Sequence, residues 1–152
     1  LTLLVLGTAG YLWLRRRGRV AAFVLGTVGG GLVLSTLLKL GIDRPRPAPE
    51  LRESTVFSSS FPSGHATMAA VTYLTLGALL ASVHGKRGPK RYLLAGALLI
   101  PGTVGVTRVY LGVHWPTDVC AGWALGAAWA LGCWVGAPGL RGGLDGRGQS
   151  PA

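Results

Sequence analysis

The sequence predicts an all-α integral membrane protein, built as a bundle of helices that cross a lipid bilayer. Hydrophobic residues make up 49% of its 152 residues and charged residues only 13%, which is about half the charged share of an ordinary soluble domain. The apolar residues also lie in long runs separated by short basic stretches, as in proteins with several membrane helices. A nucleic-acid-binding domain could explain the net charge of +10, but it would need a polar surface striped with arginine, so we expect no nucleic-acid partner.

Five apolar segments give the expected helices, since a helix needs about 20 apolar residues to span a bilayer. They cover residues 1–14, 20–40, 64–83, 92–107 and 116–136. The first looks cut short at its front, and the fourth contains Pro101, which a packed membrane helix tolerates. We therefore predict one membrane-embedded domain over residues 1–136, truncated at its N-terminus. Residues 137–152 are rich in Gly, Pro and Arg and are expected to form a flexible tail.

The basic clusters predict which way the helices face. They follow the first, third and fifth segments, at residues 15–19, at residues 84–91, and at Arg141 and Arg147. With five spans these clusters lie on one side, which the positive-inside rule assigns to the cytoplasm. The tail is then cytoplasmic. The connections over residues 41–61 and 108–115 face the periplasm or cell exterior, across what we expect to be a bacterial plasma membrane.

Pairs of glycines four residues apart predict where helices pack closely. Two small residues with this spacing lie on one helix face, so that a neighbouring helix can approach. The pairs are Gly26 with Gly30, Gly122 with Gly126, and Gly132 with Gly136. We expect packing surfaces here rather than phosphate-binding loops, because the pairs lie inside the spans.

Polar residues gather where the predicted spans meet the outer face, in three short stretches. The first ends the second span, the second opens the third span, and the third joins the fourth span to the fifth. In chain order these stretches contain Lys39 and Arg46, then Ser63, Gly64 and His65, then Arg108, His114 and Asp118. A single basic residue at a span end is usually an anchor, but three such stretches at one face indicate a shared site.

Five of these residues could bind a phosphate group. Lys39, Arg46 and Arg108 supply three cations, and the planar guanidinium groups match pairs of phosphate oxygens. Ser63 and Gly64 begin a helix, where free N–H groups and the helix dipole favour an anion. We therefore expect a phosphate-binding pocket at this face.

The two histidines and the aspartate could carry out the chemistry. His114 and Asp118 lie on one helix face if the fifth helix starts early, and a carboxylate on one imidazole nitrogen orients the other and raises its basicity. His65 could then give a proton to the leaving alkoxide. The same three side chains could bind zinc, but nearby cations would repel a divalent ion, so we expect neither a metal nor another cofactor.

These residues resemble the three-part signature of the type 2 phosphatidic acid phosphatase superfamily, which is K-x6-R-P, P-S-G-H and S-R-x5-H-x3-D. The matching residues are Lys39, Arg46 and Pro47, then Pro62, Ser63, Gly64 and His65, then Arg108, His114 and Asp118. Thr107 stands where the family has serine, so we expect weaker or displaced hydrogen bonding to phosphate there. The resemblance covers residues 20–136 and implies a six-helix bundle, so that one span is expected to be missing ahead of Leu1.

The resemblance also implies roles for these residues. His114 is the expected nucleophile that forms a phosphohistidine, Asp118 orients it, and His65 protonates the leaving group. The expected phosphate-binding residues are Lys39, Arg46, Ser63, Gly64 and Arg108. Implied substrates are phosphatidic acid, phosphatidylglycerol phosphate, diacylglycerol pyrophosphate and undecaprenyl pyrophosphate. Arg44 adjoins the first motif and is interpreted equally as a helper in headgroup binding or as a solvated charge.

Three other functions stay open. A phosphoenzyme could pass its phosphate to a lipid or alcohol acceptor, which would make the protein a phosphotransferase. Vanadium haloperoxidases share the family's helical core and phosphate-binding pocket, although apolar spans favour a lipid substrate. The basic outer surface could also capture anionic headgroups without turnover, but spans two to five hold no ionisable residue at mid-depth, where transport pathways usually have one. The identity of the lipid and the oligomeric state are left open.

Overall fold

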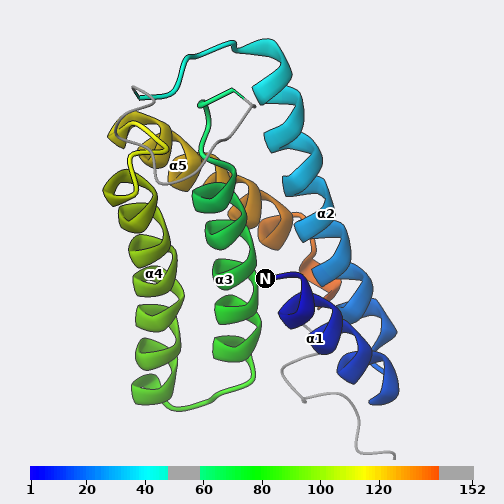
Figure 1. Cartoon of the computed structure of the whole chain (residues 1–152). Helices are drawn as coiled ribbons and strands as arrows, with labels where there is room; N and C mark the ends of the chain where they lie inside the picture. Colours follow the sequence, from blue (N-terminus) through cyan, green and yellow to red (C-terminus); the bar gives the residue numbers. More distant parts are fainter. Residues whose placement is uncertain (48–58, 141–152) are drawn as a thin grey trace, which may run out of the picture.

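The computed structural model describes residues 1–47 and 59–140, and the regular elements in these ranges are helices. In chain order they are α1 (Thr2–Leu14), α2 (Gly18–Gly41), α3 (Gly64–Ser82), α4 (Arg87–Tyr110) and α5 (Pro116–Val135) (Figure 1). Helices α2 to α5 are long and apolar enough to cross a membrane, whereas α1 has only 13 residues. The expected all-α membrane bundle is confirmed, but only four of its five predicted spans reach spanning length.

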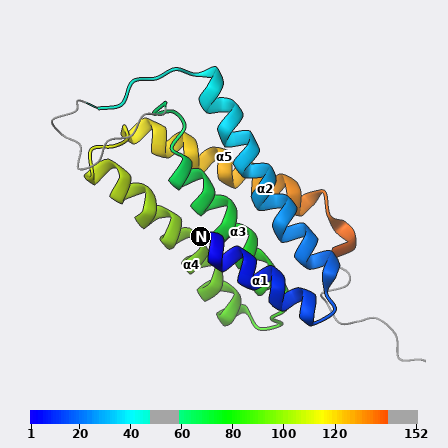
Figure 2. The ribbon, with the colours of Figure 1, turned by 45° about the vertical axis from the view of Figure 1, so that its right-hand side comes forward.

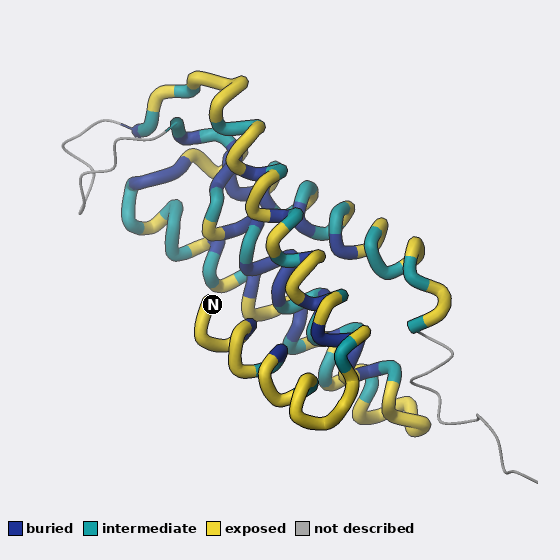
Figure 3. Tube along the Cα trace, turned by 90° about the vertical axis from the view of Figure 1, so that its right-hand side faces the viewer, coloured by how far each residue is buried: buried dark blue, intermediate teal, exposed yellow. Residues whose placement is uncertain are grey.

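Helix α3 forms the centre of the bundle. It packs against α2, α4 and α5, and α5 crosses behind it in the views of Figures 1 and 2. In its most apolar stretch 56% of the residues are buried, against 33% or less in the other three long helices. Figure 3 shows the same contrast, because α1 and the outer face of α2 are largely exposed. The exposed leucines and valines of the outer helices therefore suit contact with lipid tails.

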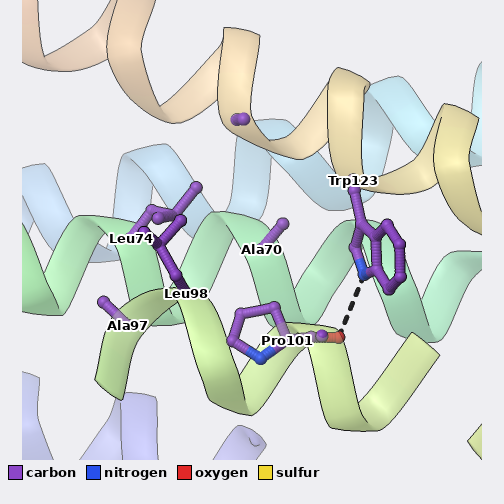
Figure 4. Close-up of a pocket in the computed structure, with 8 residues that line it drawn as sticks. Ala70, Leu74, Ala97, Leu98, Pro101 and Trp123 are labelled. Carbon is purple, nitrogen blue, oxygen red and sulfur yellow. Dashed lines mark hydrogen bonds between the residues drawn. The ribbon is translucent and has the colours of Figure 1, made fainter. Parts of the chain in front are cut away.

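Helix α4 extends beyond the predicted segment 92–107 at both ends. It begins at Arg87 and ends at Tyr110, because basic residues are compatible with a helix even where they end the apolar run. Pro101 lies inside this helix and is buried. The indole N–H of Trp123 on α5 donates a hydrogen bond to the Pro101 carbonyl at 3.0 Å (Figure 4), so α4 and α5 are joined next to the proline.

The glycine pair of α5 brings that helix against the backbone of α3. A methyl group on Gly122 would lie 2.8 Å from the Ser63 carbonyl oxygen, and one on Gly126 would lie 2.6 Å from the Thr67 carbonyl oxygen. Both distances are shorter than atoms can approach without a shift, so only glycine fits at these two positions. The sequence prediction for this pair is confirmed.

The other two glycine pairs do not pack closely at both members. Neither Gly26 nor Gly132 has a described atom within 4 Å of a methyl group placed on it, whereas one on Gly30 would lie 2.5 Å from the Trp129 ring. The prediction is therefore confirmed for Gly30 but not for the pairs as a whole. Close packing occurs instead at Gly105, against the Trp123 ring, and at Gly77, against Ala97. Spacing alone missed these contacts, because a single glycine opposite a large or small side chain leaves no repeating pattern.

The C-terminal end of the described chain bears on the predicted tail. Residues 138–140 form a helical turn, and Leu140 packs against the core cluster of Val5, Val20, Val24 and Leu79. The predicted tail therefore does not begin at residue 137. The rest of that tail, residues 141–152 with Arg141 and Arg147, lies outside the described residues, as do residues 48–58 of the connection between α2 and α3.

Candidate active site

The three polar stretches meet at one end of the bundle, where α2 and α4 end and α3 and α5 begin (Figure 1). A cavity of about 320 Å³ lies there between α2 and α3. It is lined by Lys39, Arg46, Gly64, His65 and His114, together with Leu1, Leu32, Ser35, Thr36 and Met68. Five of the eight predicted site residues thus share one cavity. Ser63, Arg108 and Asp118 lie outside its lining.

The pairing of His114 with Asp118 differs from the expected helical face. Helix α5 begins at Pro116, so His114 precedes the helix and Asp118 lies in its first turn. The Asp118 carboxylate folds back over the helix start, where its Oδ2 accepts the Trp115 N–H at 2.9 Å. His114 Nδ1 then lies 3.6 Å from the same oxygen, which is slightly beyond a hydrogen bond.

The opposite nitrogen of His114 faces the cationic residues. Arg46 Nη1 lies 3.3 Å from His114 Nε2 and donates a hydrogen bond to the Val113 carbonyl at 2.7 Å. Lys39 Nζ and Arg46 Nη2 both donate to the Ser59 carbonyl, at 2.9 and 3.3 Å. Main-chain carbonyls thus hold both cations beside one edge of the imidazole.

This environment keeps the His114 imidazole neutral at ordinary pH. Burial first, and then the positive charges of Arg46 and Lys39, lower the pKa of His114 to about 4, against the opposing attraction of Asp118. A neutral imidazole carries one proton, and the position of Nδ1 opposite the carboxylate favours that proton on Nδ1. Nε2 then stays unprotonated, with its electron pair facing Arg46 Nη1 at 3.3 Å.

Asp118 is fully buried and has partners from three parts of the chain. Arg44 Nη1 donates to its Oδ1 at 2.7 Å, and the buried Ser60 hydroxyl donates to its Oδ2. Arg44 is therefore not only a solvated charge, because it contacts a buried carboxylate; this contact does not test its expected part in headgroup binding. No sequence signal identified Ser60, which lies two residues before the second motif.

The start of α3 is tied to the start of α5 through Ser63. Its main-chain N–H donates to the Asp118 carbonyl at 3.0 Å, while its hydroxyl is buried without a hydrogen-bond partner among the described residues. Gly64 follows as the first residue of α3 and lines the cavity. A helix start of this kind suits an anion.

The comparisons with known proteins agree with this geometry. Residues 20–141, most of the chain, match the family model of the PAP2 superfamily. The chain belongs to the PAP2 superfamily. Phosphatidylglycerophosphatase B from Bacillus subtilis is 38% identical over 133 residues, which cover 83% of this chain and 62% of that protein. The family resemblance carried by the three motifs is thereby confirmed.

Two further proteins extend the comparison. Undecaprenyl-diphosphatase from Sulfolobus acidocaldarius is 38% identical over 108 residues, which cover 71% of this chain and 46% of that protein. This chain thus spans less than two thirds of the length of both of these curated relatives. A crystal structure of a transmembrane PAP2-type phosphatidylglycerolphosphate phosphatase from Bacillus subtilis matches with a TM-score of 0.81 and 29% identity, covering 90% of this chain and 68% of that one. The match supports an integral membrane protein.

The third PAP2 motif departs from the family at Thr107, and its arginine lies apart from the cavity. The Thr107 hydroxyl donates to the Val104 carbonyl of its own helix at 2.7 Å. Arg108 does not line the cavity, and its Nε is buried without a hydrogen-bond partner in the described part of the chain. A buried donor of this kind usually has a partner, so the phosphate-binding role of Arg108 stays a prediction.

A second cavity of about 310 Å³ lies between α3, α4 and α5 and does not belong to the PAP2 site. Figure 4 shows its apolar lining, including Ala70, Leu74, Ala97, Leu98, Pro101 and Trp123. It holds no ionisable side chain. Residues 1–47 and 59–140 also contain no cluster of three or more His, Cys, Asp or Glu side chains suited to a metal ion. Independence from metals stays a prediction.

Proposed function

We propose that this chain is a membrane lipid phosphatase that hydrolyses a phosphomonoester or diphosphate of a lipid. The observation that carries the proposal is the neutral, buried His114, held between the Asp118 carboxylate and the cations Lys39 and Arg46. A buried imidazole with one nitrogen opposite a carboxylate and the other unprotonated is suited to nucleophilic attack. Cations beside it are suited to the negative charge of a phosphoryl group.

The proposed reaction runs through a phosphohistidine. His114 Nε2 attacks phosphorus while the bond from phosphorus to the lipid oxygen breaks, and His65 gives that oxygen its proton. The imidazole becomes positively charged as it attacks, and Asp118 stabilises that charge. Water, deprotonated by His65, then attacks the phosphohistidine and releases inorganic phosphate. Lys39 and Arg46, with the N–H of Gly64, stabilise the phosphoryl oxygens through both steps.

The shape of the cavity supports a lipid as the substrate. Lys39, Thr36 and Leu32 are spaced three and four residues apart on α2, so they lie on one face of that helix. All three line the cavity, and Met68 lines it from α3. One cavity therefore joins a cationic end to an apolar wall that continues along a membrane helix. Phosphatidylglycerol phosphate, phosphatidic acid and undecaprenyl diphosphate all combine such a charged end with apolar chains.

Phosphate release by the purified protein tests this function directly. Detergent-solubilised protein is mixed with each of these three lipids in EDTA, and inorganic phosphate is measured. We expect release from at least one lipid, undiminished by EDTA, because side-chain cations supply the positive charge. Activity that disappears with EDTA and returns with a divalent metal would contradict the metal-free mechanism. Binding of all three lipids without phosphate release would instead identify a lipid-binding protein.

We also propose that the site faces the periplasm or cell exterior. The basic residues of the α1–α2 and α3–α4 turns lie at the end of the bundle opposite to His114 (Figure 1), and basic turns usually stay in the cytoplasm. In a protein whose Cys120 and Cys133 are replaced by serine, an impermeant maleimide is expected to label Asp43→Cys in intact cells. His84→Cys, at the other end, should react only after lysis. The reverse pattern would place the site in the cytoplasm.

A further inference from the structure

Several groups besides its proposed partner His114 bind the carboxylate of Asp118. Its Oδ1 accepts from Arg44 Nη1, and its Oδ2 accepts from the Ser60 hydroxyl and the Trp115 N–H. His114 Nδ1, at 3.6 Å, is the most distant of these neighbours. The direction in which the carboxylate points is therefore set mainly by groups other than the imidazole.

Arg44 is the charged member of this set and is itself fixed on several sides. Its Nη1 carries two N–H groups, and these donate to Asp118 Oδ1 at 2.7 Å and to Thr117 Oγ1 at 2.8 Å. The guanidinium carbon also lies 5.9 Å from the centre of the Trp115 ring, within the range of a cation–π contact. The Arg44 main-chain N–H is bonded to Ser59 Oγ at 3.3 Å.

The two side chains of the Arg44–Asp118 ion pair differ in solvent exposure, and this difference decides what the pair contributes. The Arg44 side chain is 36% exposed, whereas Asp118 is fully buried. Because solvent screens the arginine, the pair adds little to stability by itself. The buried carboxylate, by contrast, is shielded from solvent, so its position and its field depend on the groups bonded to it. Loss of Arg44 would therefore act first on Asp118 and, through it, on His114.

We propose that Arg44 is a positioning residue of the phosphatase: it binds Asp118 Oδ1 so that Oδ2 stays directed at His114. The inference rests on the proposed function, since it assigns to Arg44 a part in preparing the nucleophile. Arg44 does not line the cavity, so it acts without touching the substrate. By sharing the negative charge of Asp118, it also limits how strongly that carboxylate draws a proton onto His114.

The pKa of His114 can be measured without any substrate, and it tests this role of Arg44. The charged groups that face His114 are Lys39 from α2, Arg46 from the α2–α3 connection and Asp118 from α5, with His65 of α3 in the same cavity. Replacing Arg44 leaves these four in place and removes the cation that shares the Asp118 charge. Arg44→Gln is therefore expected to raise the pKa of His114 by about one unit, the size of a typical effect of a nearby charge.

Histidine-labelled protein in detergent gives this pKa by NMR. The chain has three histidines, so His84→Gln and His65→Gln assign the His114 signal. We expect the His114 pKa near 4 in the unaltered protein, about one unit higher in Arg44→Gln, and unchanged in Arg44→Lys, which keeps the charge. The matched control is Arg91→Gln, an exposed arginine at the opposite end of the bundle, which should leave the pKa unchanged.

Activity gives a second, independent readout. We expect Arg44→Gln to lower kcat about 10- to 100-fold with little change in KM, as supporting residues behind a functional group typically do. The acid limb of its pH profile should move upward with the His114 pKa, because only the neutral imidazole attacks. In the Asp118→Asn background the same replacement should have almost no further effect, since Arg44 then lacks the charge through which it acts.

The outcomes separate this inference from the proposed function. An unchanged His114 pKa in folded Arg44→Gln, or additive effects of Arg44→Gln and Asp118→Asn, would overturn the role of Arg44 while leaving the phosphatase intact. Absence of phosphate release from every lipid would overturn the function, whereas the NMR result would stand. If Arg44→Gln fails to fold, Arg44→Met decides, because it keeps a long side chain and removes the charge that faces Asp118. An unchanged His114 pKa there rejects the inference.

Discussion

Replacement of His114 with glutamine is expected to lower phosphate release by about 10⁴-fold or more, the usual cost of removing a nucleophile. Glutamine has a similar reach and can still accept a hydrogen bond from Arg46, which lies 3.3 Å from His114 Nε2. It cannot form a covalent bond to phosphorus. The loss should therefore appear in kcat while lipid binding is kept, because Lys39 and Arg46 keep their carbonyl partners.

The matched control for this variant is His84→Gln. His84 is exposed at the far end of α3, where its ring contacts the Leu80 carbonyl, so its loss should leave phosphate release unchanged. Rapid base quenching with a ³²P-labelled lipid should trap a phosphoenzyme in the unaltered protein and in His84→Gln, but not in His114→Gln. Acid treatment should then release its phosphate, as expected of a phosphohistidine. If His114→Gln kept more than a tenth of the activity, another residue would have to be the nucleophile.

Replacement of Gly126 with alanine is expected to destabilise the bundle by about 1–3 kcal/mol, as overpacking of a filled interior does. The added methyl group would lie 2.6 Å from the Thr67 carbonyl oxygen and 2.7 Å from Ala70 Cβ. The first of these is backbone, so α3 and α5 must separate. The midpoint of thermal unfolding in detergent should fall by about 2–4 °C for each kcal/mol lost.

Gly132→Ala provides the opposite expectation on the same helix. Nothing described lies within 4 Å of a methyl group at this position, and alanine favours a helix over glycine by about 1 kcal/mol. Its unfolding midpoint should therefore stay level or rise. Activity should fall only in Gly126→Ala, because separation of α3 from α5 moves His65 away from His114. Equal midpoints for the two variants would show that α5 does not pack on α3 through Gly126.

The helices and the motif residues could be predicted because both depend on short-range patterns in the sequence, namely apolar runs and motif spacings. Long apolar runs place α2, α3 and α5 to within a few residues. The spacings within each motif, and the position of each motif at a span end, bring Lys39, His65 and His114 to one cavity. Helix ends were less predictable at α4, because the apolar run ends where Arg91 and Lys90 begin, although the helix continues through them.

Contacts between segments could not be predicted in the same way. Arg44 and Ser60 are separated from Asp118 by 74 and 58 positions, and no local pattern signals that they meet it. The orientation of His114 also depends on where α5 begins. A start at Pro116 puts His114 ahead of the helix, so the two side chains meet across a helix start rather than along a helix face.

The joint between α3 and α5 has a consequence for how the protein responds to its bilayer. The Ser63 N–H bonds to the Asp118 carbonyl, and Gly122 brings the two helices into backbone contact beside it, so His65 and Asp118 belong to one rigid pair of helices. Lys39 belongs to α2, which packs less extensively against α3 than α5 does. A change in membrane thickness or tension would therefore tilt α2 first, so that affinity for phosphate would respond before the rate of bond cleavage.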